Sequence, residues 1–326
     1  MKASVDLLAF FGRALLSMLV TPQRLPGRSW RAELVCRISR RLLHASMERD
    51  VGWLRERQNL LRHYHPAQRK VRFESETIAG VPCQWCASPG ANRDSPLVLY
   101  FHGGGFVIGN VAVYRPMLAA LAVAGDCTLL GVDYRLAPEH PLPAAQEDCL
   151  AVCRAMLDRY PARPLILAGD SAGGSLCLST LVALRDEGRT VAGSLLISPL
   201  CEPGATDPSM TRNEKTDLLS QPLTEHWASH ATAGKPTPEQ LSRLDFMSAD
   251  LGSLPPLCIQ SAEGEILFDQ IERFAMRAKE QGVDVDYQPT PGQFHVFQIF
   301  APLVPEANIA IGKLGSAIKA MTQRSI

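Results

Sequence analysis

From about residue 71 onward, short apolar runs alternate with longer amphipathic stretches. The short runs predict eight β-strands, at residues 71–78, 81–87, 97–101, 128–134, 165–169, 194–198, 257–261 and 285–288. Apolar positions at helical spacing predict helices between them, at residues 116–124, 144–159, 172–187, 269–281 and 305–322. Gly188 and Gly282 directly follow two of these helices and are expected to end them in the left-handed conformation.

The alternation of strands and helices predicts an α/β fold. Two of the central strands read Leu-Val-Leu-Tyr and Leu-Ile-Leu-Ala, without a polar residue, as strands do when both faces of the sheet are covered. We therefore expect a mostly parallel, eight-stranded sheet with helices on both faces.

Two regions lack this alternation. Residues 1–70 show only helical patterns, and residues 200–250 combine Pro, Thr and Ser with short helical pieces. The pattern therefore divides the chain into a helical segment, residues 1–70, and an α/β domain, residues 71–326, that contains residues 200–250 as an insertion. Both irregular regions are expected to fold together as a cap over the sheet.

Charge and composition narrow the function. The 33 basic and 33 acidic side chains cancel, which argues against binding nucleic acid through a general basic field, and the 46% hydrophobic content argues against disorder. The balance is uneven, because residues 1–72 carry fifteen Lys and Arg but only five Asp and Glu. This basic segment is interpreted as a solvated helical appendage, as a layer docked on the acidic remainder, or as a contact to an anionic membrane surface.

The apolar stretch at residues 5–20 bears on the membrane question. Asp6, Gly12, Arg13 and Ser17 interrupt it and Pro22 ends it, so it is too short for a comfortable span and lacks the features of a signal peptide. We expect an amphipathic helix, with peripheral membrane contact through residues 1–20 as one of its roles.

The nine cysteines are an odd number and most lie within apolar runs, as buried free thiols do. This pattern favours a reducing compartment, so the protein is expected in the cytoplasm. Cys83 and Cys86 have the C-x-x-C spacing, but they lie on a predicted strand and no second pair follows. No metal and no cofactor are expected.

Residues 165–174 contain the strongest chemical signal. Their sequence, Leu-Ile-Leu-Ala-Gly-Asp-Ser-Ala-Gly-Gly, places the pattern G-x-S-x-G between an apolar strand and a helix. In that context the central serine sits on a sharp turn that lifts its hydroxyl above the sheet. Ser171 is therefore the predicted nucleophile.

A second signal, His102-Gly-Gly-Gly105, directly follows the strand at residues 97–101. Glycines allow several backbone N–H groups to face one point, as a developing oxyanion requires. The predicted donors are the N–H groups of Gly104, Gly105 and Ala172, and His102 is expected to brace the loop. The Lys-Ser/Thr ending of a phosphate-binding loop is missing.

A serine nucleophile requires a base, which in this fold class follows the nucleophile and the acid along the chain. His226, His230 and His295 are the histidines after residue 200. His295 follows the last predicted strand, whereas the other two lie in the predicted cap. His295 is therefore the predicted base.

The orienting acid is expected after the strand at residues 257–261. Glu263, Glu265 and Asp269 all qualify by their distance from that strand. Asp269 is also a candidate N-cap for the next helix, and Glu263 a candidate solvated side chain.

Together, these motifs resemble the hormone-sensitive-lipase-like (bacterial family IV) branch of the α/β-hydrolases. The resemblance covers residues 71–326 and includes Asp133-Tyr-Arg-Leu-Ala-Pro-Glu-His-Pro141, which in the family is a structural turn with buried ion pairing. The family carries its acid in an Asp-Pro-Leu-x-Asp-Glu stretch. Here the matching residues 265–270 read Glu-Ile-Leu-Phe-Asp-Gln, so the acid position falls on Glu265, a departure from the usual Asp.

The resemblance implies a serine carboxylesterase that hydrolyses small-molecule esters with short to medium acyl chains, and it is compatible with a homodimer. The predicted catalytic residues are Ser171, Glu265 and His295. Alternatives on the same fold are a lipase active at lipid surfaces, an amidase, and a catalytically silent receptor for small molecules.

Overall fold

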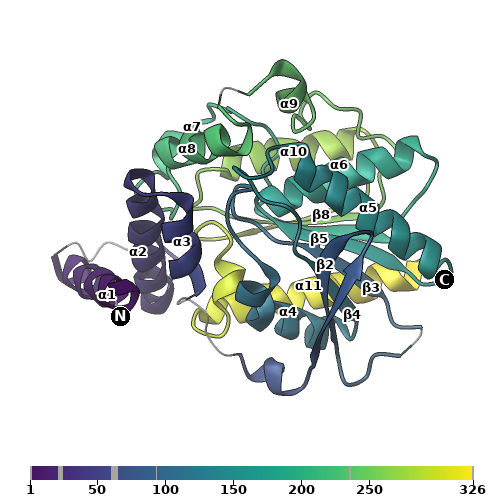
Figure 1. Ribbon diagram of the computed structural model, residues 1–326, viewed down its shortest axis with the longest axis horizontal. Coiled ribbons are helices and arrows are strands. Elements are labelled where there is room, and N and C mark those ends of the chain that lie inside the picture. Colours follow the sequence, from purple (N-terminus) through teal and green to yellow (C-terminus); the bar gives the residue numbers. More distant parts are fainter. Residues whose placement is uncertain (1, 21–24, 60–64, 93, 235, 325–326) are drawn as a thin grey trace.

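The computed structural model describes the chain except residues 1, 21–24, 60–64, 93, 235 and 325–326. Its eight strands form one sheet in the order β1-β2-β4-β3-β5-β6-β7-β8 (Figure 1). Their bounds are β1 Phe73–Ile78, β2 Val81–Ala87, β3 Leu97–Phe101, β4 Thr128–Val132, β5 Leu165–Asp170, β6 Gly193–Ile197, β7 Leu257–Ala262 and β8 Val285–Thr290. The predicted eight-stranded α/β fold is confirmed.

All neighbouring strands from β4 to β8 pair in parallel, whereas β2 runs antiparallel to both β1 and β4. The β1–β2 hairpin turns at Ala79 and Gly80, which have φ angles of 50° and 81°. Two consecutive positive φ angles match the right-handed twist of a tight hairpin. Because the strands from β4 to β8 run parallel, their carboxyl ends lie at one edge of the sheet, where loops collect.

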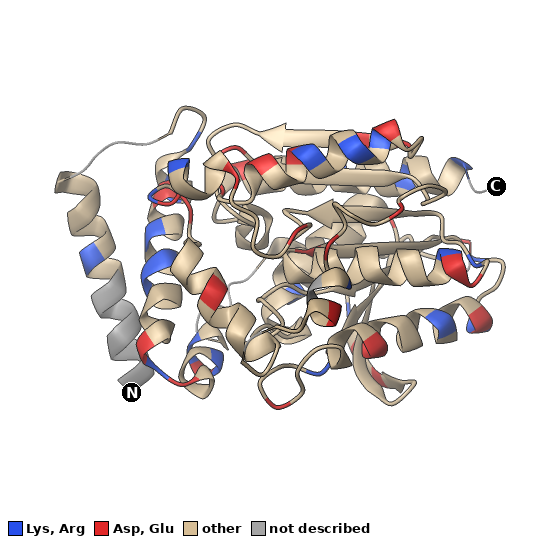
Figure 2. Ribbon diagram, turned by 90° about the horizontal axis from the view of Figure 1, so that it is seen from above, with Lys and Arg blue, Asp and Glu red and all other residues tan. Residues whose placement is uncertain are grey.

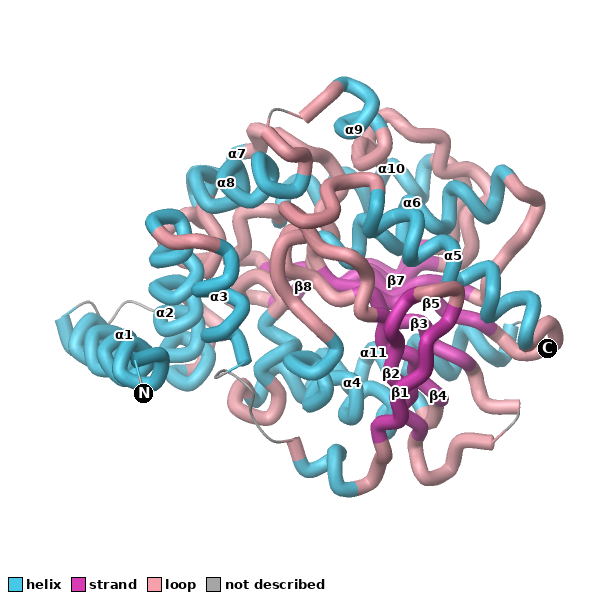
Figure 3. The backbone as a smooth tube through the Cα atoms, viewed as in Figure 1, coloured by secondary structure: helices cyan, strands magenta, loops and turns pink. Residues whose placement is uncertain are grey.

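Helices cover both faces, as predicted, and every residue of β3 and β5 is buried. Helices α4 (Val111–Gly125) and α11 (Pro305–Arg324) pack together on one face, and α5 (Ala144–Arg159), α6 (Ala172–Asp186) and α10 (Phe268–Glu280) cover the other (Figure 3). Helix α10 is strongly amphipathic and buries Ile271, Phe274, Ala275 and Ala278, one stripe of its surface.

The predicted ends of these helices are mostly confirmed. Gly188 and Gly282 follow α6 and α10 with φ angles of 67° and 83°, the left-handed conformation expected of them. The predicted start of α4 at residue 116 is wrong, because the helix begins at Val111. The side chain of Asn110 accepts a hydrogen bond from the N–H of Val113 and caps the helix one turn earlier than Pro116 suggested.

The N-terminal segment is helical, as predicted, with α1 (Lys2–Val20), α2 (Trp30–Ala45) and α3 (Val51–Gln58). The insertion contains α7 (Pro208–Arg212), α8 (Gln221–Ala231) and α9 (Pro238–Ser242). Short 3₁₀ turns lie at Ser46–Glu48, Pro66–Arg69 and Phe297–Phe300. Helix α1 packs on α2 and lies outermost, at the far end from the C-terminus (Figure 1). Among the described helices, none combines the length and the apolar character that crossing a bilayer requires.

All nine cysteines are buried free thiols, as their apolar surroundings predicted. Cys83 and Cys86 lie on β2 and are at most 1% exposed, so they belong to the core. Burial raises the pKa of both thiols to about 12, which keeps them protonated and unreactive.

Candidate active site

Ser171 occupies the sharp turn between β5 and α6. Its backbone has φ 52° and ψ −120°, a conformation that non-glycine residues rarely adopt. Two glycines make room for the turn, because a Cβ on Gly173 would overlap the carbonyl oxygen of Phe101 and one on Gly169 would overlap the carbonyl oxygen of Gly173. The turn therefore forces the serine side chain out of the sheet.

Ser171 and His295 line the same pocket, which has a volume of about 140 Å³. Its walls come from several separate parts of the chain: α2 and α3, the glycine loop after β3 with the start of α4, the turn after β5, the insertion, and the loop after β8. Most of the lining is apolar and includes Leu42, Leu43, Leu54, Ile108, Val113, Leu218, Leu219, Trp227, Ile299 and Phe300. Ser171, the predicted nucleophile, thus opens into an apolar chamber at the carboxyl edge of the sheet.

His295 is oriented by a buried carboxylate. Its Nδ1 lies 2.6 Å from Oε2 of Glu265, which is fully buried. The other oxygen of Glu265 accepts the N–H of Ala262 at 2.8 Å and the hydroxyl of Ser198 at 3.0 Å. With both oxygens engaged, Glu265 fixes the imidazole in one orientation. Among the described residues, Nε2 of His295 has no hydrogen-bond partner, so this ring nitrogen is available to a proton donor in the pocket.

The surroundings of His295 favour its charged form. Burial alone would lower the pKa of His295, but the hydrogen bond and charge of Glu265, with the charges of Asp217 and Asp170, outweigh burial and raise it above its ordinary value of 6.5. An imidazole in this setting accepts a proton from a hydroxyl more readily and holds the resulting charge.

The other two acid candidates lie elsewhere. Asp269 pairs with Arg212 at 2.7 Å and accepts the N–H of Ser209 at 2.8 Å. It lies in the first turn of α10, whose N-cap is Leu267, so its predicted capping role is wrong. Glu263 is exposed, in keeping with a solvated side chain. Of the three candidates, the structure brings only Glu265 to His295.

The glycine loop presents free N–H groups beside Ser171. Gly104 and Gly105 have φ angles of 114° and 61°, and Gly104 lines the pocket. A Cβ on Gly105 would lie 2.7 Å from a ring carbon of Trp227, another lining residue. Within the described residues, the N–H groups of Gly104, Gly105 and Ala172 find no hydrogen-bond acceptor. Three unpaired donors at a reactive serine suit a developing oxyanion.

Buried side chains hold this loop in place. Asp170, next to Ser171, accepts hydrogen bonds from the N–H of Gly103 at 3.0 Å and from the hydroxyls of Tyr100 and Tyr114 at 2.7 and 2.8 Å. Burial raises the pKa of Asp170 to about 6, against the opposing effect of these donors. The sequence analysis missed this network, although Asp170 lies inside the G-x-S-x-G motif.

His102 also braces the loop, as predicted. Its ring stacks on Tyr134 with centroids 4.3 Å apart, and its Nδ1 lies 2.8 Å from the carbonyl oxygen of Gly103. In the described part of the chain, no three His, Cys, Asp or Glu side chains lie close enough together to hold a metal ion.

Known proteins share this architecture. A family model for the alpha/beta hydrolase fold matches residues 98–299. An acetyl-hydrolase from Streptomyces hygroscopicus is 32% identical over 76% of this chain and 82% of its own length. The carboxylesterase NlhH of Mycobacterium tuberculosis is 32% identical over 77% of this chain and 81% of its own. An esterase crystal structure from the bacterial hormone-sensitive lipase family is 35% identical, with a TM-score of 0.78 over 87% of this chain and 98% of that one.

The chain belongs to the α/β-hydrolase family, which also accounts for its sheet order and for the serine at the turn after β5. Within that family it is an esterase of the hormone-sensitive-lipase-like branch, an enzyme that hydrolyses carboxylic esters. The resemblance inferred from its motifs is confirmed.

Proposed function

We propose that this esterase is a serine carboxylesterase that cleaves short- to medium-chain esters through an acyl-enzyme on Ser171. The observation that carries the proposal is that His295, hydrogen-bonded to the buried Glu265, lines the same pocket as the strained Ser171. A nucleophile, a base and a group that orients the base are the parts that acyl transfer requires.

In the first half of the reaction, Nε2 of His295 takes the proton of the Ser171 hydroxyl while Oγ attacks the ester carbonyl carbon. The negative charge that develops on the carbonyl oxygen is held by the N–H groups of Gly104, Gly105 and Ala172. The tetrahedral intermediate then collapses, the bond to the alcohol oxygen breaks, and His295 donates its proton to the departing alcohol.

In the second half, a water molecule attacks the acyl-enzyme and gives a proton to His295. The second tetrahedral intermediate releases the carboxylic acid, and the proton returns from His295 to Oγ of Ser171. Glu265 keeps its hydrogen bond to Nδ1 and stabilises the imidazolium that forms in each half.

The size of the pocket supports a short acyl chain. An apolar cavity of about 150 Å³ holds a ligand the size of benzene. The pocket of about 140 Å³ therefore suits an acyl chain of up to about six carbons. Helices α2, α3 and α8 supply much of its wall, so we propose that residues 1–70 and 200–250 act as the cap that selects the acyl group.

The test is hydrolysis of p-nitrophenyl esters from acetate to palmitate. We expect kcat/KM to be highest between acetate and hexanoate and to fall steeply for longer chains. Ser171→Ala should lower kcat at least about 10⁴-fold, because no other group replaces the nucleophile. Ser179→Ala, on the same helix, removes a hydroxyl that binds only the carbonyl of Leu176, and it should keep wild-type kcat.

Activity of Ser171→Ala near the wild-type level would contradict the acyl-enzyme on this residue. A maximum at palmitate would contradict the proposed chain length, even if Ser171 proves essential.

A second candidate, action on esters at an anionic lipid surface, is favoured by helix α1. Phe11, Leu15, Leu16, Leu19 and Val20 are 42% to 80% exposed and cover the outer side of this helix. Exposed apolar patches of this kind mark binding surfaces. Arg13 lies on α1, and basic positions recur along the neighbouring α2 (Figure 2). Cations beside apolar residues suit an anionic membrane surface.

Vesicle flotation tests this surface. Wild-type protein should bind vesicles of phosphatidylcholine with phosphatidylglycerol and bind pure phosphatidylcholine less. Leu16→Glu with Leu19→Glu should abolish binding but keep hydrolysis of p-nitrophenyl butyrate, whereas Ile309→Glu, which changes an exposed residue 65% accessible on α11, should leave binding intact. Equal flotation of all variants would contradict the proposal. A dimer that dissociates on the double substitution would also contradict it, because the apolar side of α1 would then be a subunit interface.

A further inference from the structure

Asp217 joins the two loops that carry the base and the acid. It is fully buried and lies in the insertion, just before Leu218 and Leu219 of the pocket wall. Its Oδ1 accepts the N–H of His295 at 2.9 Å, and its Oδ2 accepts the N–H of Ile266, the neighbour of Glu265, at 2.9 Å. Oδ1 also accepts the N–H of Leu218 at 2.7 Å. One carboxylate thus binds three backbone segments together.

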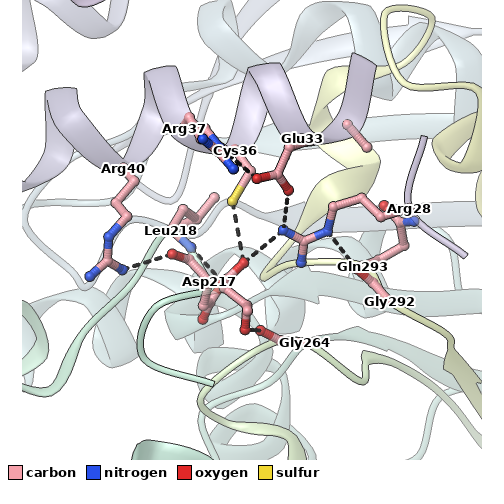
Figure 4. Close-up of polar contacts among 12 residues, drawn as sticks. Arg28, Glu33, Cys36, Arg37, Arg40, Asp217, Leu218, Gly264, Gly292 and Gln293 are labelled. Atoms are coloured by element: carbon pink, nitrogen blue, oxygen red, sulfur yellow. Dashed lines mark hydrogen bonds and ion pairs between the residues drawn. The ribbon is translucent and has the colours of Figure 1, made fainter. Parts of the chain in front are cut away.

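Helix α2 and Arg28, which lies shortly before this helix, hold the segment around Asp217 in place (Figure 4). Arg40 donates to the carbonyls of Asp217 and Leu219 at 2.8 and 2.9 Å. Arg28, a buried cation that also pairs with Glu33, donates to the carbonyl of Thr216 at 2.8 Å. The N-terminal segment therefore reaches the catalytic loops through residues 216–219.

A second set of bonds fixes the acid turn to the same segment. The side-chain amide of Asn213 donates to the carbonyls of Glu263 and Glu265, both at 2.8 Å. The hydroxyl of Thr216 donates to the carbonyl of Gly264 at 3.2 Å. The turn that carries Glu265 is therefore positioned by the insertion as well as by its own strand.

In the described part of the chain, the side-chain carboxylate of Asp217 forms no salt bridge, although Arg28 and Arg40 bind neighbouring backbone carbonyls. Its three bonds all come from backbone N–H groups, and the charged groups that face it are His295 and Glu265. The thiol of Cys36 approaches from α2 and stays protonated, because burial raises its pKa to about 12. A buried carboxylate on neutral donors is costly, so its position beside the base points to a role in the site.

We propose that Asp217 is a positioning residue for ester hydrolysis, which fixes the His295 loop against the Glu265 turn and adds a second negative charge near the imidazole. This inference rests on the proposed roles of Ser171, Glu265 and His295. An amide at position 217 would remove the charge and would set its NH₂ group against a backbone N–H, so the two loops would separate slightly. A displacement of about 1 Å at a reacting group can lower the rate about 100-fold.

The first test compares Asp217→Asn with Asp148→Asn. Asp148 is a matched buried carboxylate, held on α5 by Arg135 at 2.8 Å. Asp217→Asn should lower kcat about 10- to 100-fold with KM within about twofold, since the pocket wall remains. Asp148→Asn should lower the melting temperature but keep wild-type kcat.

The pH dependence separates positioning from loss of stability. Asp217, Glu265 and Asp170 are the anions that face His295, and each favours its protonated form. Removal of the charge at 217 should therefore lower the pKa of His295 and move the acidic limb of kcat/KM to lower pH. NMR titration of the His295 ring reports the same shift without any substrate. The Asp148→Asn protein should titrate like the wild type.

Asp217→Glu keeps the charge but lengthens the side chain. It should lower kcat about tenfold and leave the acidic limb of kcat/KM in place. If Asp217→Asn does not fold, this variant still tests whether Asp217 positions the two loops. Wild-type kcat in either folded variant would overturn the inference, as would an unshifted His295 titration in Asp217→Asn or an equal loss of kcat in Asp148→Asn. Failure of the proposed function has a different signature: the Ser171→Ala variant would then keep activity near the wild-type level.

Discussion

At the scale of single residues, the geometry of the site distinguishes the acidic side chain that contacts His295 from its acidic neighbours. Glu265 replaces the shorter Asp of the resembled family, and the added methylene is accommodated because Ala262 and Ser198 hold its second oxygen. The motif alignment identified Glu265, but Asp269 stayed open from the sequence, since both lie within one short stretch. Only the fold shows that Asp269 turns away to Arg212.

Exchange of these two acids for amides tests the assignment. Glu265→Gln should lower kcat about 10⁴-fold, because an amide can donate to Nδ1 of His295 and hold the wrong tautomer. Asp269→Asn breaks a half-exposed ion pair, so it should cost at most about 1 kcal/mol of stability and change kcat little. Kinetics with p-nitrophenyl butyrate and thermal unfolding measure both effects. A larger loss in Asp269→Asn would move the acid to that position.

At the scale of elements, helix α3 braces the loop that carries the proposed oxyanion donors. The guanidinium of Arg55 donates to the carbonyl of Val107 at 2.8 Å and to that of Ala137 at 2.7 Å, and it pairs with Glu139 at 2.8 Å. Gln58 accepts the N–H of Gly109 at 3.0 Å. The sequence predicted the glycine loop from its own motif but not this support, because the supporting residues come from about fifty positions earlier and carry no motif.

Arg55→Met should therefore affect both stability and rate. We expect a loss of about 2 kcal/mol in unfolding free energy, because charge-assisted hydrogen bonds contribute about 1.5–3 kcal/mol each. We also expect kcat to fall about tenfold, part of the effect of losing one oxyanion donor. Arg154→Met, which breaks an ion pair with Glu187 on the far helices, is the control and should change neither quantity much. An unchanged kcat in Arg55→Met would mean that the loop holds its shape without α3.

At the scale of the whole molecule, the sequence predicted the sheet, its flanking helices and the order of the motifs, because each rests on a local pattern. It did not predict how the basic N-terminal segment docks. Arg28 and Arg40 reach the rest of the chain through backbone carbonyls, and Arg55 reaches it through its ion pair with Glu139. No local sequence pattern shows which backbone group a side chain will bind, so the contacts of residues such as Asp217 could be recognised only in the folded structure.

The pocket wall has one further consequence. Leu42, Leu43 and Leu54 come from helices that precede the stretch matched by the family model, residues 98–299, whereas Ser171, Glu265 and His295 lie inside it. Under the proposed function, part of the acyl-binding wall thus lies outside the matched stretch, on helices that also carry Arg40 and Arg55. We therefore expect an exchange of α2 and α3 between related esterases to change acyl preference and rate together, since the same two helices shape the wall and support the catalytic loops.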